Sequence, residues 1–209
     1  MEKDKTKIEV FLLNENASPV SGLPHLLSSS RLVPLFICCL FTFNLSYSKD
    51  LPIQSFSIRA RVSEKTLLGA DATEDFKAYD LTVNFELPWK RYSKSGWGMG
   101  RRWMVSTGLL HGAGKDALVL SAIPELTLGS EDGRFTLDMG AGGALMSRHR
   151  FGTQNFGGPF QFALTMGISI PLYKNLGLGY RFMHYSDAGV WGSNTTGADF
   201  HMIELNSRF

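Results

Sequence analysis

Downstream of residue 50, apolar and polar positions alternate with a period of two, which predicts β-strands rather than helices. The pattern is clearest in 160–170, where even positions are Phe, Leu, Met or Ile and odd positions are small or polar. Clusters of Gly, Asn, Asp and Ser separate such segments and predict turns. Eight segments share the pattern: 55–63, 76–87, 102–111, 117–128, 134–146, 159–171, 176–187 and 198–209.

The charges on these segments lie on the face opposite the apolar one. Tyr79 and Leu81 share one face of their segment, whereas Asp80 and Glu86 share the other, and Arg59 is likewise opposite the apolar positions of 55–63. A soluble barrel buries its apolar face. Segments of about ten residues with an almost charge-free face instead suit lipid outside and a packed polar interior. The sequence therefore predicts an all-β, eight-stranded antiparallel transmembrane β-barrel.

Glycines, aromatic residues and the end of the chain agree with an outer-membrane barrel. The 22 glycines suit a narrow lumen, and Trp89, Trp103 and Trp191 lie towards segment ends, where aromatic girdles occur. The last residue, Phe209, follows Leu205 on one face and resembles the C-terminal signal read by the outer-membrane insertion machinery. We therefore expect that machinery to be a partner.

An even strand number places both ends of the barrel in the periplasm and the connection 188–197 at the cell surface. The short stretches 129–133 and 171–175 suit periplasmic turns. The basic, aromatic stretch 88–101 is expected to be an unusually long periplasmic connection.

The N-terminal part predicts a signal peptide. An apolar run at 32–43 follows Arg31, and Ser46 and Ser48 suit cleavage before Lys49. This divides the chain into an N-terminal extension and signal peptide, 1–48, and a barrel, 49–209. A transmembrane helix is the weaker alternative, because the run is short and contains a proline. The true start residue is left open.

Composition excludes several kinds of chemistry. Cys38 and Cys39 precede the cleavage site, so the mature barrel has no thiol for disulfides or catalysis; a lipoprotein anchor at either lacks the usual preceding small residue. The net charge of +2 offers no basic field for nucleic acid. The five histidines show no metal-ligand spacing, so neither a metal nor another cofactor is expected.

The candidate chemistry lies in the last two segments. His184 and Ser186 are two residues apart and share a strand face, so an imidazole could reach the hydroxyl. Asp199, on the following strand, is in phase with His201 and Ile203. All three candidates then face the membrane near its outer edge. Ser186 would be the nucleophile, His184 the general base and acid, and Asp199 the group that orients the imidazole.

Two interpretations of this outward trio stay open. If the three side chains face the hydrocarbon of the membrane, the free-energy cost of placing polar groups there indicates a functional site. If His184 and Ser186 instead lie at the level of the lipid headgroups, that cost is small and the two residues would be incidental.

At these residues the sequence resembles the PagL family of outer-membrane lipid A 3-O-deacylases. The run His184-Tyr-Ser186-Asp-Ala-Gly189, followed by Asn194, Gly197 and Asp199, is similar to the family's His-x-Ser-Asn motif and downstream carboxylate. Weaker similarity extends over residues 76–209 and includes Gln154-Asn-Phe-Gly157. The resemblance implies a metal-free serine esterase acting on lipopolysaccharide in the outer leaflet, with a Ser/His/acid triad outside the barrel.

The resemblance also implies further site residues. Asp187 replaces the family's Asn and cannot donate a hydrogen bond when ionised, so oxyanion donors would be backbone amides of Asp187, Ala188 or Gly189. The acid is Asp199 where the family typically has Glu. Independently of the resemblance, Arg148 and Arg150 flank His149 in a surface loop and are weaker candidates for substrate contact, together with Asn194, because arginines could meet lipid A phosphates. A solvated cluster of loop charges is the alternative for the two arginines.

Two rival functions remain. One is a non-enzymatic small barrel with a structural or adhesion role, and the other is a different lipid A enzyme, such as an acyltransferase with a lumenal acyl pocket. The outward phase of His184 speaks against the second. The sequence is compatible with a homodimer, and it leaves oligomeric state, acyl-chain preference and latency open.

Overall fold

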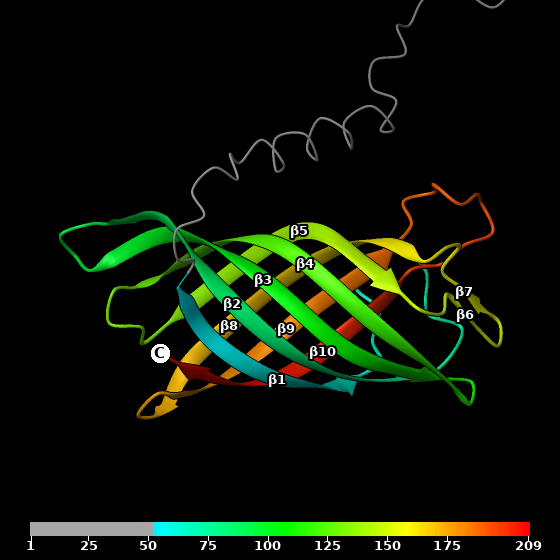
Figure 1. Ribbon diagram of the computed structural model, residues 1–209, viewed down its shortest axis with the longest axis horizontal. Helices are drawn as coiled ribbons and strands as arrows, with labels where there is room; N and C mark the ends of the chain where they lie inside the picture. Colours follow the sequence, from blue (N-terminus) through cyan, green and yellow to red (C-terminus); the bar gives the residue numbers. More distant parts are fainter. Residues whose placement is uncertain (1–51) are drawn as a thin grey trace, which may run out of the picture. The chain divides into compact units, whose positions relative to one another are not determined.

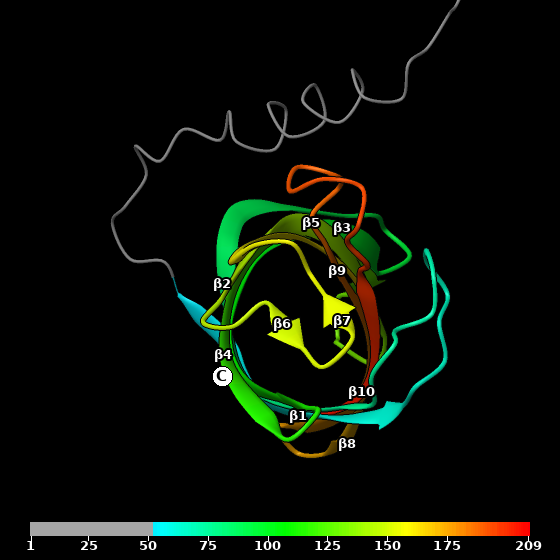
Figure 2. The same cartoon turned by 90° about the vertical axis from the view of Figure 1, so that its right-hand side faces the viewer.

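The computed structural model describes residues 52–209, which form a closed antiparallel barrel (Figures 1 and 2). The predicted signal peptide and its cleavage site lie outside the described residues. Eight strands close the barrel in the order β1-β10-β9-β8-β5-β4-β3-β2. Their bounds are β1 Ile53–Ser63, β2 Phe76–Tyr92, β3 Trp97–Gly112, β4 Lys115–Ser130, β5 Thr136–Met146, β8 Phe160–Tyr173, β9 Leu176–Ser186 and β10 Ala198–Arg208.

The eight-stranded all-β prediction is confirmed, and its apolar face points outwards. On β8, for example, Leu164, Met166, Ile168 and Ile170 are 39–49% exposed, whereas the intervening Thr165 is buried. Within residues 52–209, no helix is long and apolar enough to cross a bilayer.

The two ends of the barrel differ. At one end, the first strand begins at Ile53 and the last strand ends at Arg208, and the connections between the other strands are short turns. At the other, which we call the loop end, lie the connections 64–75, 113–114, 147–159 and 187–197. The third connection contains β6 (Arg150–Phe151) and β7 (Gln154–Asn155), a small sheet that lies across the barrel opening (Figure 2).

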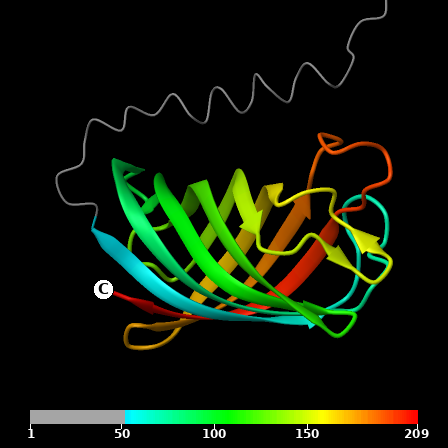
Figure 3. The same ribbon diagram turned by 45° about the vertical axis from the view of Figure 1, so that its right-hand side comes forward.

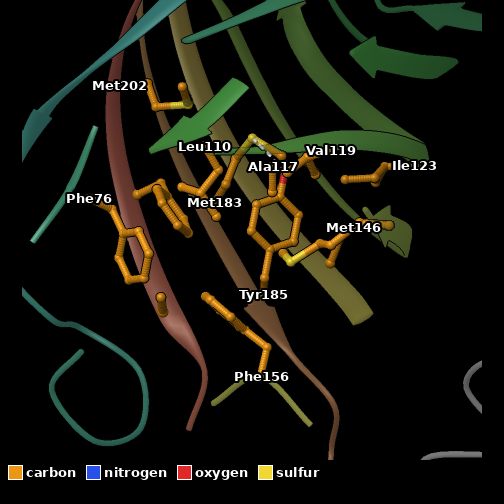
Figure 4. Packing of buried hydrophobic residues seen from close by; sticks show 14 of the residues in the cluster. Phe76, Leu110, Ala117, Val119, Ile123, Met146, Phe156, Met183, Tyr185 and Met202 are labelled. Atoms are coloured by element: carbon orange, nitrogen blue, oxygen red, sulfur yellow. Dashed lines mark hydrogen bonds between the residues drawn. The ribbon is translucent and has the colours of Figure 1, made fainter. Parts of the chain in front are cut away.

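The lumen is polar only in part, which corrects the expectation of a polar interior throughout. Buried ion pairs join Arg102, Glu125, Asp138, Arg181 and Glu204. Towards the loop end, the lumen is instead filled by an apolar cluster that includes Phe76, Phe156, Met183, Tyr185 and Phe200 (Figure 4). The connections that close this end supply part of the cluster, so the loops pack into the barrel.

The prediction of a long connection over 88–101 is wrong. β2 extends into this stretch to Tyr92 and β3 begins within it at Trp97, so that the two strands form a paired hairpin with only 93–96 between them. A register shift between Glu86 and Lys90 accommodates Pro88, whose missing N–H cannot join a regular ladder. Apart from Lys94 in the turn, the basic and aromatic residues of this stretch therefore lie on strands.

Candidate active site

Strand register places the predicted trio on the outer wall of the barrel. His184 on β9 pairs with Asp199 on β10. Both are in phase with lipid-facing side chains on their strands, Leu178 and Tyr180 on β9 and Ile203 on β10, which are 38–42% exposed. His184 and Asp199 themselves are only 8% and 2% exposed. The site is thus an outward-facing pair covered by neighbouring segments.

The histidine and the carboxylate form a close hydrogen bond. His184 Nδ1 lies 2.6 Å from Asp199 Oδ1. A carboxylate can only accept, so Nδ1 carries a proton, and in the neutral ring Nε2 is the unprotonated nitrogen. An imidazole that is protonated at Nδ1 and unprotonated at Nε2 is the tautomer required for a general base. The second oxygen of Asp199 accepts hydrogen bonds from the backbone amides of Leu67 and Leu68.

Ser186 lies beside this pair at the end of β9. It is partly exposed, and its hydroxyl makes no hydrogen bond to another residue in the range 52–209. Gly197 packs between the two side chains: a Cβ placed on Gly197 would lie 3.0 Å from His184 Cε1 and 3.1 Å from Ser186 Cβ. The imidazole and the serine therefore border the same small space.

A tight turn follows Ser186. Val190 N donates to Asp187 O at 3.0 Å, and Ala188 and Gly189 both have positive φ, which is the type I′ arrangement. The buried Asp187 carboxylate accepts from Gly189 N at 3.0 Å, Trp191 N at 3.1 Å and Thr195 Oγ1 at 3.0 Å. Of the three predicted oxyanion donors, the Gly189 amide is thus occupied by a bond within the turn.

Gln154 joins three loop-end connections and has no exposed surface. Its Oε1 accepts from Thr73 N at 2.9 Å, and its Nε2 donates to Thr196 O at 2.8 Å and Gly197 O at 3.1 Å. Gln154 therefore holds the backbone of Gly197 against the His184 ring. The sequence resemblance included this glutamine, but no local pattern indicated its partners.

The weaker substrate-binding candidates are dispersed. Arg148 Nε donates to Asp116 O at the start of β4, three strands from β9 in the barrel order. Arg150 is exposed on β6. Asn194 is exposed nearer the site, and its carbonyl accepts from Asn155 Nδ2 at 3.0 Å. Among residues 52–209, no group of three or more His, Cys, Asp or Glu side chains could hold a metal ion.

Comparisons with known proteins give one family. The family model described as lipid A 3-O-deacylase (PagL) matches residues 77–208. The crystal structure of the outer membrane enzyme PagL shares the fold: the TM-score is 0.60 at 20% identity, over 74% of this chain and 99% of that one. The backbone structure of the Yersinia pestis outer membrane protein Ail has a TM-score of 0.46 at 12% identity, over 76% and 100%. No curated protein matches.

Proposed function

The chain belongs to the PagL family of lipid A 3-O-deacylases, which are outer-membrane β-barrels, and we propose that it hydrolyses the 3-position ester of lipid A with Ser186, His184 and Asp199 as its triad. The observation that carries this proposal is the 2.6 Å hydrogen bond between His184 and Asp199 on the lipid-facing wall. A membrane-embedded ester can reach such a site from the side, within the outer leaflet.

In the proposed reaction, Ser186 Oγ attacks the ester carbonyl carbon while His184 Nε2 takes the hydroxyl proton. Asp199 stabilises the resulting imidazolium. His184 then returns the proton to the 3-oxygen of the sugar, which leaves and yields an acyl-enzyme. A water molecule, deprotonated by His184, releases the fatty acid and restores Ser186. We assign the oxyanion to the backbone amides of Asp187 and Ala188.

The outer wall beyond Asp199 suits an acyl chain. A groove on β10, β1, β2, β3 and β4 is lined largely by apolar side chains, among them Ile58, Ala60, Leu81, Ile203 and Leu205. Ile203 and Leu205 follow Asp199 on the same face of β10. An acyl chain lying along this wall would pass from the ester towards the membrane centre. The loop end would then face the cell surface.

Lipid A mass spectrometry tests the function. The chain and its Ser186→Ala variant are expressed in a lipopolysaccharide-containing host without a deacylase of its own. Wild type alone should remove one acyl unit from the 3-position. The variant's folding is checked by its electrophoretic shift on heating. Intact lipid A with both folded proteins would contradict the proposal and favour a structural or adhesion role.

Phe209 bears on assembly in the membrane. Its side chain is 81% exposed, and its amide donates to Gln54 O at 3.1 Å. We propose that the insertion machinery reads this terminus. Deleting Phe209 should lower the amount of folded barrel without changing the kcat of the barrel that does fold.

A further inference from the structure

The connection between β1 and β2 lies outside the barrel wall, beside β10 (Figures 2 and 3). Its residues Leu67 and Leu68 are 64% and 40% exposed, so their side chains contribute little packing. Their backbone amides, in contrast, both donate to Asp199 Oδ2, and the bond from Leu68 is 2.7 Å long. A segment more than a hundred residues from Asp199 in the chain thus supplies both hydrogen-bond donors to Oδ2.

A second histidine fastens this segment to the wall. His201 follows Asp199 by two residues on the same outward face of β10 and is 6% exposed. His201 Nε2 lies 2.8 Å from Lys65 O. A carbonyl only accepts, so Nε2 carries a proton and, in the neutral ring, Nδ1 accepts from the hydroxyl of Tyr180. The proposed ester hydrolysis does not use His201.

These contacts leave the Asp199 carboxylate little freedom to rotate. Oδ1 is held by His184 and Oδ2 by two amides. Hydrogen bonds to a carboxylate are among the stronger ones in proteins. Because the carboxylate orients the imidazole, a rotation of Asp199 would turn His184 Nε2 away from Ser186. Orientation of this kind is worth large rate factors.

We propose that residues 65–68, fastened by His201, are a positioning element of the active site that holds Asp199 in its working orientation. The expected effect on kcat rests on the proposed function. The expected effect on geometry is independent of that function: without the segment, the His184–Asp199 hydrogen bond loses its fixed geometry even if the protein hydrolyses no ester.

Backbone donors can be removed with proline. Leu68→Pro deletes one amide donor to Asp199, whereas Leu68→Ala keeps the N–H and removes only the side chain. His201→Phe leaves the segment's backbone unchanged and removes the bond to Lys65 O, and His201→Gln restores a donor there. The two histidine variants decide the question if the proline variant does not fold.

Two measurements are made on folded barrels in detergent micelles. One is the kcat for fatty acid release from lipid A, and the other is the low-field proton resonance of His184 Nδ1–H. Leu68→Pro and His201→Phe should lower kcat about 10–100-fold and shift or broaden the resonance. Leu68→Ala and His201→Gln should stay within about threefold of wild type and keep the resonance.

The two measurements separate the two proposals. Folded Leu68→Pro and His201→Phe variants with wild-type kcat and an unchanged resonance would overturn the positioning role. If wild type releases no fatty acid, the proposed function fails. The resonance then decides alone: a shift confined to Leu68→Pro and His201→Phe supports the positioning role, and an unchanged resonance overturns it.

Discussion

Gly197 lies against His184 so closely that no side chain fits between them: a Cβ at position 197 would be 3.0 Å from His184 Cε1 and 2.7 Å from Tyr185 O. The backbone of the β9–β10 connection therefore passes directly over the imidazole. A glycine is required here by close approach rather than by an unusual φ.

We therefore expect Gly197→Ala to displace the imidazole or the serine and to lower kcat about 10–100-fold, since misplacement by about 1 Å is that costly. Gly179→Ala is the matched control, because its Cβ would meet Ile168 O at a similar 3.0 Å but lies remote from the triad. Release of fatty acid from lipid A by folded protein measures the effect. Equal losses in both variants would show that crowding a strand, and not the site, is responsible.

Gln154 holds Gly197 in place from the other side. Gln154→Ala leaves Thr73 N and two carbonyl oxygens without their buried partner. The free energy of unfolding should fall by about 1–3 kcal/mol, as measured by urea titration in micelles, and kcat should fall with it. Gln154→Glu keeps the acceptor for Thr73 but places a carboxylate beside Thr196 O and Gly197 O. Full activity in Gln154→Glu would contradict this role.

Asp187 is an acceptor for three donors, although the motif it resembles has Asn there. Asp187→Asn offers one oxygen, and its NH₂ group would face the N–H of either Gly189 or Trp191. We expect the turn after Ser186 to loosen and kcat to fall about tenfold, because hydrogen bonds to a charged group are worth about 1.5–3 kcal/mol. A variant as active as wild type, or more so, would show that the amide itself serves the oxyanion better than the ordered turn does.

Arg181 in the lumen should matter for stability and not for chemistry. It forms ion pairs with Glu125, Asp138 and Glu204 at 2.8–2.9 Å and is buried. Arg181→Ala leaves Arg102 as the cationic partner of Glu125 and Asp138, and Arg59, 3.7 Å away, as that of Glu204. The buried network then carries excess negative charge, so we expect a loss of about 3–5 kcal/mol in unfolding free energy. The exposed pair Arg134–Asp132 provides the control, since Arg134→Ala should leave the unfolding free energy nearly unchanged. An Arg181→Ala barrel as stable as wild type would contradict the role assigned to the network.

Much of the architecture could be predicted from the sequence, because the signal is local. A period of two decides which side chains share a strand face, and this alone placed His184, Ser186 and Asp199 outwards. The same pattern predicted eight strands and an apolar outer face. It failed at 88–101, which was expected to be a long connection, because β2 and β3 pair along most of this stretch and a register shift between Glu86 and Lys90 accommodates Pro88.

The surroundings of the site were decided only by the tertiary structure. Leu68 and Asp199 are 131 positions apart, and Gln154 bonds to residues on two other connections. Closing the barrel brings these connections together at one end, and the donors involved are largely backbone amides, which carry no residue-specific signal. The tertiary structure also decided the position of Arg148. Its charge made it a candidate for substrate contact, and barrel closure places it beside Asp116, away from β9. Alternation along a strand thus determines which way a side chain points, and barrel closure determines what it meets.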